Sequence, residues 1–186
     1  MKRFAILLLA MCAAAAFGAE TVLDVNGSFN AVKPGAKLPD GWLWNQGPNP
    51  VRTYEMVQID GKNAVKFVGE KNMLGAVYLK YFPVKPGEKY ELSVTVSGTT
   101  GKGGSVNVGM HLWSDKDYLV GNYANGTKLT GKPMTVKRVI TIPETVVRKA
   151  KDGTDTKIAP TKMRVLFLLW SPGEATFTDF TAKKLD

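Results

Sequence analysis

Cysteine and histidine are almost absent from this chain of 186 residues, which has one of each. The cysteine, Cys12, lies in an apolar run near the start, so the remainder has no thiol for a disulfide or a nucleophile. The histidine, His111, has no second histidine or cysteine with which to share a zinc ion. These absences exclude a disulfide framework, cysteine-based catalysis and a histidine-based zinc site.

Long hydrophobic runs are also missing. The longest covers the 14 residues 4–17, whereas a membrane-spanning helix needs about 20. Lys2 and Arg3 precede this run, and Gly18 and Ala19 follow it, as in a secretory signal peptide. We therefore expect residues 1–19 to be a signal peptide. Residues 20–186 are expected to form a secreted or periplasmic domain that is not bound to a membrane.

The charge is unbalanced toward basic residues. Lysine and arginine number 25 against 16 acidic residues, a net charge of +9, which becomes +7 without Lys2 and Arg3 (9 − 2). The basic residues are scattered and form no stripe interleaved with stacking aromatics, so we expect no nucleic-acid partner. The excess fits either an ordinary soluble surface or a preference for an anionic polysaccharide.

Helical periodicity is absent after the first residues, and strand patterns replace it. Short apolar segments separated by glycine, proline and asparagine turns predict an all-β sandwich or barrel in one domain. The predicted strands are 51–59, 63–68, 73–82, 88–97, 105–113, 134–142, 162–170 and 175–184. The composition gives no sign of a second domain, and we expect a monomer.

Alternation along two strands tells which side faces the core. In 88–97 the apolar set is Tyr90, Leu92, Val94 and Val96. In 105–113 it is Val106, Val108, Met110 and Leu112, which leaves Ser105, Asn107, Gly109, His111 and Trp113 on the other face. A tryptophan on a small and polar face indicates a surface that something covers.

Four short motifs add a resemblance to a known family. NGSFN (26–30), LPDGW (38–42), VKPGEKY (84–90) and SPGEATFTDF (171–180) occur in this order. Together they resemble the secreted jelly-roll carbohydrate-binding modules of families four, nine and twenty-two, which are galactose-binding-domain-like antiparallel β-sandwiches. The resemblance implies that Trp42 packs inside the sandwich, and we expect Trp44 on the opposite side, at the surface.

The outward face of 105–113 is the strongest candidate for binding a sugar. Flat sugar rings pack on aromatic faces, and their hydroxyls need planar polar partners. Gly109 is expected to leave a hollow between Asn107 and Trp113. The segment 114–127 is either a glycan-binding loop or an ordinary polar loop, and Trp170 is either a site residue or a buried edge of the core. The predicted carbohydrate-binding residues are Trp113, His111, Asn107, Tyr118, Tyr123, Trp44, Arg164 and Trp170.

The resemblance also raises a structural calcium ion, because related modules hold one between their first and last strands. The matching positions are Asn30 and the pair Thr178 and Asp179, so Asp179 is the one carboxylate left as a calcium ligand. Calcium takes six to eight oxygens. Asp179 either contributes to such a site or caps a turn with no metal bound, and we expect no other cofactor.

The sequence therefore predicts a secreted, non-catalytic carbohydrate-binding protein. A glycosidase needs two carboxylates across one cleft, and no strand facing the predicted cleft carries an E-x-D or E-x-x-E pair. A polysaccharide lyase stays open, with Tyr118 or Tyr123 as the acid and His111 or Arg164 neutralising a uronate. A structural or adhesive module of the cell envelope, which binds another protein, is the alternative of a different class.

Overall fold

Every regular element of the described chain is a β-strand. The computed structural model describes residues 20–46, 52–70, 73–123, 126–149, 153–170 and 172–186. The predicted signal peptide, 1–19, lies outside these residues. Within them, no helix is long and apolar enough to cross a membrane.

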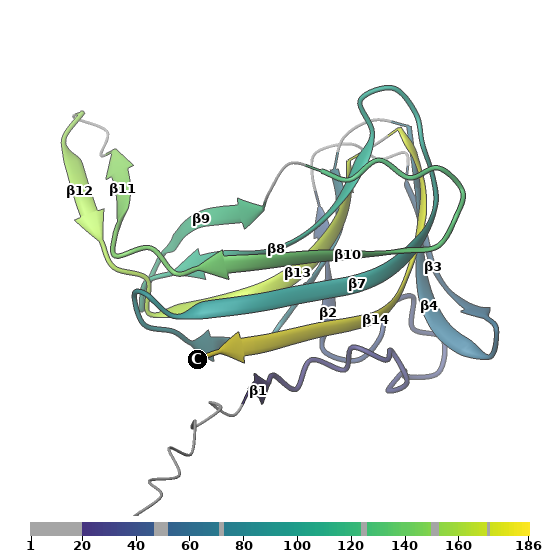
Figure 1. Cartoon of the computed structure of the whole chain (residues 1–186), viewed down its shortest axis with the longest axis horizontal. Coiled ribbons are helices and arrows are strands. Elements are labelled where there is room, and N and C mark those ends of the chain that lie inside the picture. Colours follow the sequence, from purple (N-terminus) through teal and green to yellow (C-terminus); the bar gives the residue numbers. More distant parts are fainter. Residues whose placement is uncertain (1–19, 47–51, 71–72, 124–125, 150–152, 171) are drawn as a thin grey trace, which may run out of the picture.

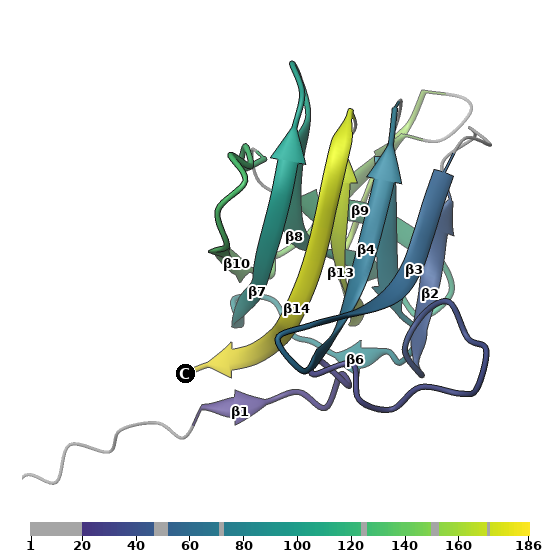
Figure 2. The same ribbon diagram turned by 90° about the vertical axis from the view of Figure 1, so that its right-hand side faces the viewer.

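Two antiparallel sheets face each other (Figures 1 and 2). Sheet A has the order β10 (Met134–Thr141), β7 (Lys89–Thr100), β14 (Gly173–Leu185), β4 (Lys62–Gly69) and β3 (Arg52–Ile59), with β1 (Thr21–Val22) paired to β14. Sheet B has the order β2 (Trp42–Gln46), β5 (Met73–Tyr78), β13 (Lys162–Trp170), β8 (Ser105–Trp113) and β9 (Tyr118–Tyr123), with β6 (Phe82–Pro83) paired to β13. The predicted all-β antiparallel sandwich is confirmed.

The core lies between the sheets and follows the predicted alternation. The apolar sets of β7 and β8 are buried against one another, together with Met163, Val165, Phe167 and Leu169 of β13. Phe167 lies at the centre of an aromatic cluster, with ring centroids 4.7 Å from Phe177 and 4.9 Å from Trp42. Trp42 is buried as expected, and its Nε1 donates to the carbonyl of Val25 at 3.0 Å.

The opening and closing motifs meet at one place in the fold. The backbone N–H of Phe180 donates to the carbonyl of Gly27 at 2.9 Å. A Cβ atom on Gly27 would collide with the carbonyl of Phe180, so this close approach requires glycine. The side-chain amide of Asn26 donates to the carbonyls of Ala31 and Asp40 at 2.9 and 3.0 Å, which fixes the loop between the two halves of the opening motif.

Several parts of the chain differ from the sequence prediction, which also left out β1 and β2. The predicted strand 73–82 is broken, because β5 ends at Tyr78 and β6 begins at Phe82. The segment 114–127, predicted as a loop, contains β9. A projecting hairpin of β11 (Val146–Lys149) and β12 (Asp155–Ile158) was not predicted at all, because its strands are short and largely exposed (Figure 1).

Candidate functional site

Sheet B turns its second face away from the core, and most of the predicted binding residues lie there. Because side chains alternate along a strand, the buried sets of β8 and β13 leave His111, Trp113 and Arg164 on this outer face. The register places Arg164 opposite His111, and Lys162 opposite Trp113, which in turn pairs with Tyr118 of β9. The outer faces of β13, β8 and β9 therefore form one continuous surface.

Aromatic rings from three segments meet on this outer face. The centroid of Trp113 lies 5.6 Å from Tyr81 and 5.3 Å from Tyr118, both edge to face. The His111 ring lies 5.3 Å from Tyr118 and 6.4 Å from Tyr123. We call this group the aromatic patch: Tyr81, His111, Trp113, Tyr118, Tyr123 and Arg164. Its rings meet edge to face and tilted, so they hold one another in place.

Arg164 belongs to the patch through its guanidinium group. The Cζ atom lies 3.8 Å from the ring centroid of Tyr81 and 5.7 Å from that of Trp113. A guanidinium stacked on an aromatic face stays charged and keeps its N–H groups in a plane. Lys162 brings a second cation to the same tyrosine, with its Nζ 4.8 Å from the ring centroid.

Two donors of the patch are buried without a hydrogen-bond partner, namely Nε1 of Trp113 and Nε of Arg164. A buried donor left without an acceptor costs about 1–3 kcal/mol. Both side chains are half-buried, but the two donor atoms themselves are buried, so a ligand oxygen recovers part of this energy only where the neighbouring rings move aside. The patch is therefore better suited to a ligand rich in acceptors than to a purely apolar one.

His111 is neutral at physiological pH. Burial, and second the positive charge of Arg164, lower its pKa from 6.5 to about 4. It therefore offers one N–H donor and one acceptor nitrogen to a ligand.

The depressed pKa predicts a pH dependence of stability. Between pH 6.5 and about 4 the unfolded chain binds a proton at His111 that the folded protein does not bind, so the free energy of unfolding should fall as pH falls through this window. The loss is at most about 3 kcal/mol. Urea unfolding of the wild type and of His111→Gln at about pH 7 and about pH 4.5 checks it. Equal pH dependence in both proteins would contradict the assignment.

Beyond the patch the outer face of sheet B becomes aliphatic. Val77, Leu166 and Leu168 form a small buried cluster, and Tyr123 packs against it. Leu43, which pairs with Val77 across the sheet, is exposed. This aliphatic cluster and the aromatic patch are thus continuous, because Tyr123 contacts both.

Trp44 and Trp170 lie on opposite sides of sheet B. Trp44 packs against the core and stacks on Tyr54 with centroids 4.0 Å apart, so its placement at the surface was wrong. Trp42 and Trp44 are two residues apart in one strand and therefore share a face. Trp170 is 41% exposed, at the far end of the outer face, so the reading as a buried edge residue was wrong.

The expected hollow at Gly109 is filled. A Cβ atom on Gly109 would lie 3.0 Å from Cβ of Tyr123, because β9 brings this tyrosine directly over the glycine. Asn107 is 4% exposed, so it lies beneath the surface and not at a rim as predicted. The glycine therefore makes room for Tyr123 and not for a ligand.

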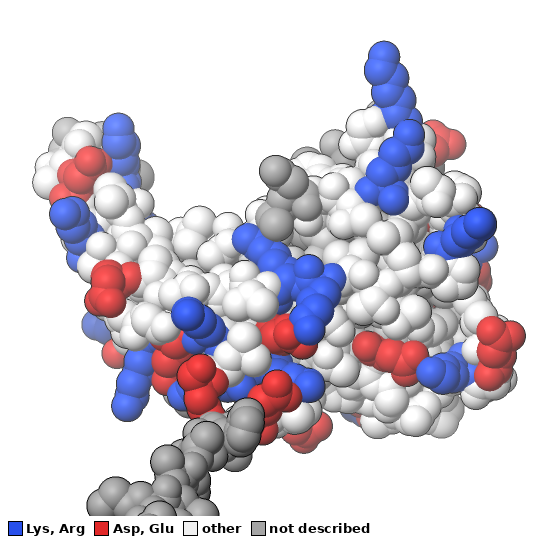
Figure 3. Space-filling model, viewed as in Figure 1, with Lys and Arg blue, Asp and Glu red and all other residues white. Residues whose placement is uncertain are grey.

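The acidic residues before β9 make contacts within the protein. The Asp115 carboxylate accepts a hydrogen bond from Thr161 Oγ1 at 2.7 Å, and Asp117 pairs with Arg148 of the hairpin at 3.2 Å. Asn122 accepts from Arg138 at 2.8 Å. These polar groups hold β9 and the hairpin in place. Figure 3 shows the surface hollowed between the projecting hairpin and the main body, with an uncharged floor in the region of β9.

The Asp179 carboxylate has a partner within the protein. Its carboxylate pairs with the Lys62 ammonium at 2.8 Å, and it occupies a left-handed turn (φ 51°) where the register of β14 shifts. Among the described residues no three acidic, histidine or cysteine side chains come together in a way that could hold a metal ion. The residues present therefore fit the turn and its lysine better than a cation with six to eight oxygen ligands.

Sequence reasoning missed Tyr81. It was assigned to the interior of a continuous strand, but the chain between β5 and β6 leaves the sheet: Leu79 is exposed, and its N–H donates to the carbonyl of Gly41 at 2.8 Å. When pairing resumes at Phe82, Tyr81 is directed onto Arg164.

No family model matches the chain, and no curated protein matches it. Solved structures share its fold. A cyclase from Fischerella sp. TAU is 12% identical, with a TM-score of 0.54 over 89% of this chain and 98% of that one. The enzymatically active domain of tailspike protein 4 of bacteriophage CBA120 is 10% identical, with a TM-score of 0.51 over 83% of this chain, which spans 21% of the tailspike chain.

The CBM22-1 xylan-binding domain from Paenibacillus barcinonensis is 13% identical, with a TM-score of 0.49 over 78% of this chain and 86% of that domain. At such identities a likeness concerns the fold alone. The chain is thus a β-sandwich whose fold is shared by the cyclase and the tailspike domain.

Proposed function

We propose that this protein is a non-catalytic carbohydrate-binding domain that holds a poly- or oligosaccharide on the outer face of sheet B. The observation that carries the proposal is the aromatic patch, in which four aromatic side chains, a neutral histidine and an arginine share one surface. Aromatic faces pack against the C–H faces of sugar rings, and the histidine and the arginine form hydrogen bonds with sugar hydroxyls. The resemblance to families four, nine and twenty-two stays a prediction.

The absence of catalysis is part of the proposal. The strands of sheet B contain no aspartate or glutamate, whereas glycoside hydrolysis needs two carboxylates about 5–10 Å apart. Asp115 and Asp117, in the turn between β8 and β9, already contact Thr161 and Arg148.

A glycan panel tests the proposal. Soluble oligosaccharides that bind should change the intrinsic tryptophan fluorescence of the purified protein, because Trp113 lies in the patch. Trp170→Ala is the matched control, since it removes an exposed tryptophan outside the patch and should leave the response unchanged. A panel without any binder, together with association to another protein, would favour the alternative of a structural or adhesive module, to which the exposed Leu43, Leu79 and Trp170 would contribute.

A second candidate is a lyase, which the closeness of His111 to Tyr118 and Tyr123 favours. In such a β-elimination a base removes the proton beside the uronate carboxyl, the C–O bond to the next sugar breaks, a C=C bond forms and the leaving oxygen gains a proton. Ultraviolet absorbance of the unsaturated product, growing during incubation with a uronate polymer, would show that the domain is catalytic.

We also propose that the protein is exported, on the strength of the apolar run 4–17 between a positively charged start and small residues. Sequencing the N-terminus of exported protein should find Ala19 or Glu20 first. Exported protein whose sequence still begins at Met1 would contradict the proposal.

A further inference from the structure

Charge is distributed very differently over the two sheets. The described strands of sheet B carry the cations Lys162 and Arg164 and no acidic residue. The strands of sheet A carry acids from Glu55 to Asp179 beside their lysines. A charged ligand should therefore meet a different electrostatic potential at each face of the sandwich.

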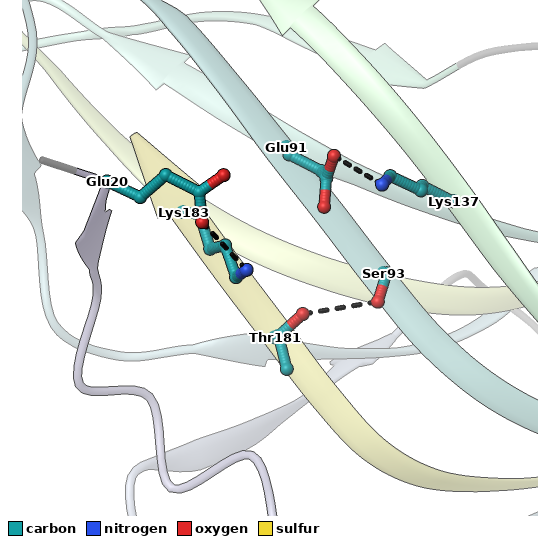
Figure 4. A network of polar contacts seen from close by, with 6 residues as sticks. All are labelled: Glu20, Glu91, Ser93, Lys137, Thr181 and Lys183. Atoms are coloured by element: carbon teal, nitrogen blue, oxygen red, sulfur yellow. Dashed lines mark hydrogen bonds and ion pairs between the residues drawn. The ribbon is translucent and has the colours of Figure 1, made fainter. Parts of the chain in front are cut away.

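The lysines of sheet A are largely neutralised by carboxylates within the protein. Lys137 pairs with Glu91 at 2.6 Å and Lys183 with Glu20 at 2.9 Å, and a hydrogen bond between Ser93 and Thr181 lies beside these pairs (Figure 4). Three more lysines of this sheet, Lys62, Lys66 and Lys184, also lie within 3.3 Å of a carboxylate oxygen. The positive charge of this face is thus mostly compensated.

Arg164 has no such compensation. No carboxylate of the described residues forms an ion pair with it, and its Nε is buried without a partner. Its contacts are with the rings of Tyr81 and Trp113. The stack holds the guanidinium in the aromatic patch, where a sugar is proposed to lie.

Asp115 and Asp117, in the turn between β8 and β9, do not pair with Arg164 because both make other contacts. Asp115 bonds to Thr161, while its backbone carbonyl accepts from Lys162 Nζ at 2.7 Å, and Asp117 belongs to Arg148. His111 faces Arg164 across the register and adds no negative charge. A half-buried, unpaired guanidinium beside two aromatic rings is an arrangement that an external anion stabilises.

From this arrangement we infer that the aromatic patch selects glycans that carry carboxylates, and that Arg164 binds the carboxylate of a uronic acid residue. The inference rests on the proposed function and narrows it. A carboxylate accepts two parallel hydrogen bonds from one guanidinium, which a neutral hydroxymethyl group cannot reproduce. Lys162 adds a second positive charge close to the ring of Tyr81.

The experiment compares each uronate polymer with its own carboxyl-reduced form. Polygalacturonate, alginate and glucuronoxylan keep their linkages when their carboxyl groups are reduced, so only the charge and the acceptor pair are lost. Affinities for the full-length purified protein are measured by calorimetry at a fixed ionic strength of about 0.15 M, where distant charges are screened. We expect at least one polymer to bind about ten- to a hundredfold more tightly before reduction.

Variants separate Arg164 from the general charge. Arg164→Gln should remove the preference, so that this variant binds the uronate form and the reduced form equally, and the test is the ratio of these two affinities within each variant. Arg164→Lys keeps the positive charge without the planar set of donors. Its preference for the uronate form should lie between that of the wild type and that of Arg164→Gln. Lys132→Gln removes the same charge from an exposed position just before β10 of sheet A and should retain the full preference. Circular dichroism and urea unfolding check that the variants are folded.

The outcomes are distinct. Equal binding of the uronate and reduced forms overturns this inference and leaves the proposed function intact. An equal loss of preference in Arg164→Gln and Lys132→Gln also overturns it, because net charge would then explain the selectivity. Absence of binding to both forms of every polymer, and to the neutral glycan panel, overturns the proposed function and the inference together.

Discussion

Replacing Trp113 with alanine is expected to weaken glycan binding about ten- to a hundredfold. The indole contacts Tyr81 and Tyr118 and lies near Arg164, so its removal takes away a stacking surface and loosens the neighbouring rings. A lost aromatic contact of this kind costs about 1–3 kcal/mol, and about 1.4 kcal/mol corresponds to a factor of ten. Calorimetric titration with a glycan from the panel measures the effect.

The fold should survive the same substitution, because Trp113 is half-buried on the outer face and lies outside the core. Trp113→Phe should retain part of the affinity. An alanine variant that unfolds, while Trp170→Ala or Trp44→Ala abolishes binding, would mean that the ligand lies elsewhere on the sandwich.

Phe167→Ala is expected to lower the free energy of unfolding by about 3–5 kcal/mol, a large part of the 5–15 kcal/mol typical of a domain. Phe167 is completely buried in β13. Its ring lies within 5.9 Å of five others, those of Phe29, Trp42, Phe67, Phe177 and Phe180. A cavity at this point would remove contacts between the two sheets, because Phe167 of sheet B packs against Phe67, Phe177 and Phe180 of sheet A. Urea unfolding at neutral pH measures the loss.

Leu43→Ala is the control for that experiment. Leu43 lies on the exposed outer face of β2, so its removal should change the free energy of unfolding by less than about 1 kcal/mol. Comparable losses in both variants would contradict the placement of the core between the sheets.

The strands with regular alternation could be predicted from the sequence, including their inward faces. The bounds of β8 and β13 agree with the prediction residue by residue. Their inner residues are β-branched or otherwise apolar at every second position, and such a pattern has one register that buries it. The outward placement of Trp113, His111 and Arg164 follows from the same argument.

The parts that sequence reasoning missed depend on contacts between distant segments. β9 has no clear alternation. It is a strand because it pairs with β8, and its Asn122 side chain accepts a hydrogen bond from Arg138. Tyr81 reaches Arg164 only because the chain leaves sheet B after Tyr78. The Gly109 hollow was a wrong interpretation for the same reason, since the residue that fills it comes from β9.

The order of the strands along the chain also constrains how this protein can fold during synthesis. β13 lies between β5 and β8 in sheet B, and β14 lies between β7 and β4 in sheet A, yet these two strands follow all the others in sequence. Until residue 162 and those after it leave the ribosome, each sheet exists as two separate halves with exposed apolar edges. Folding is therefore late and depends on pairings between distant segments, which makes it slow. A nascent chain that stays open in this way remains available for export for as long as it is being made.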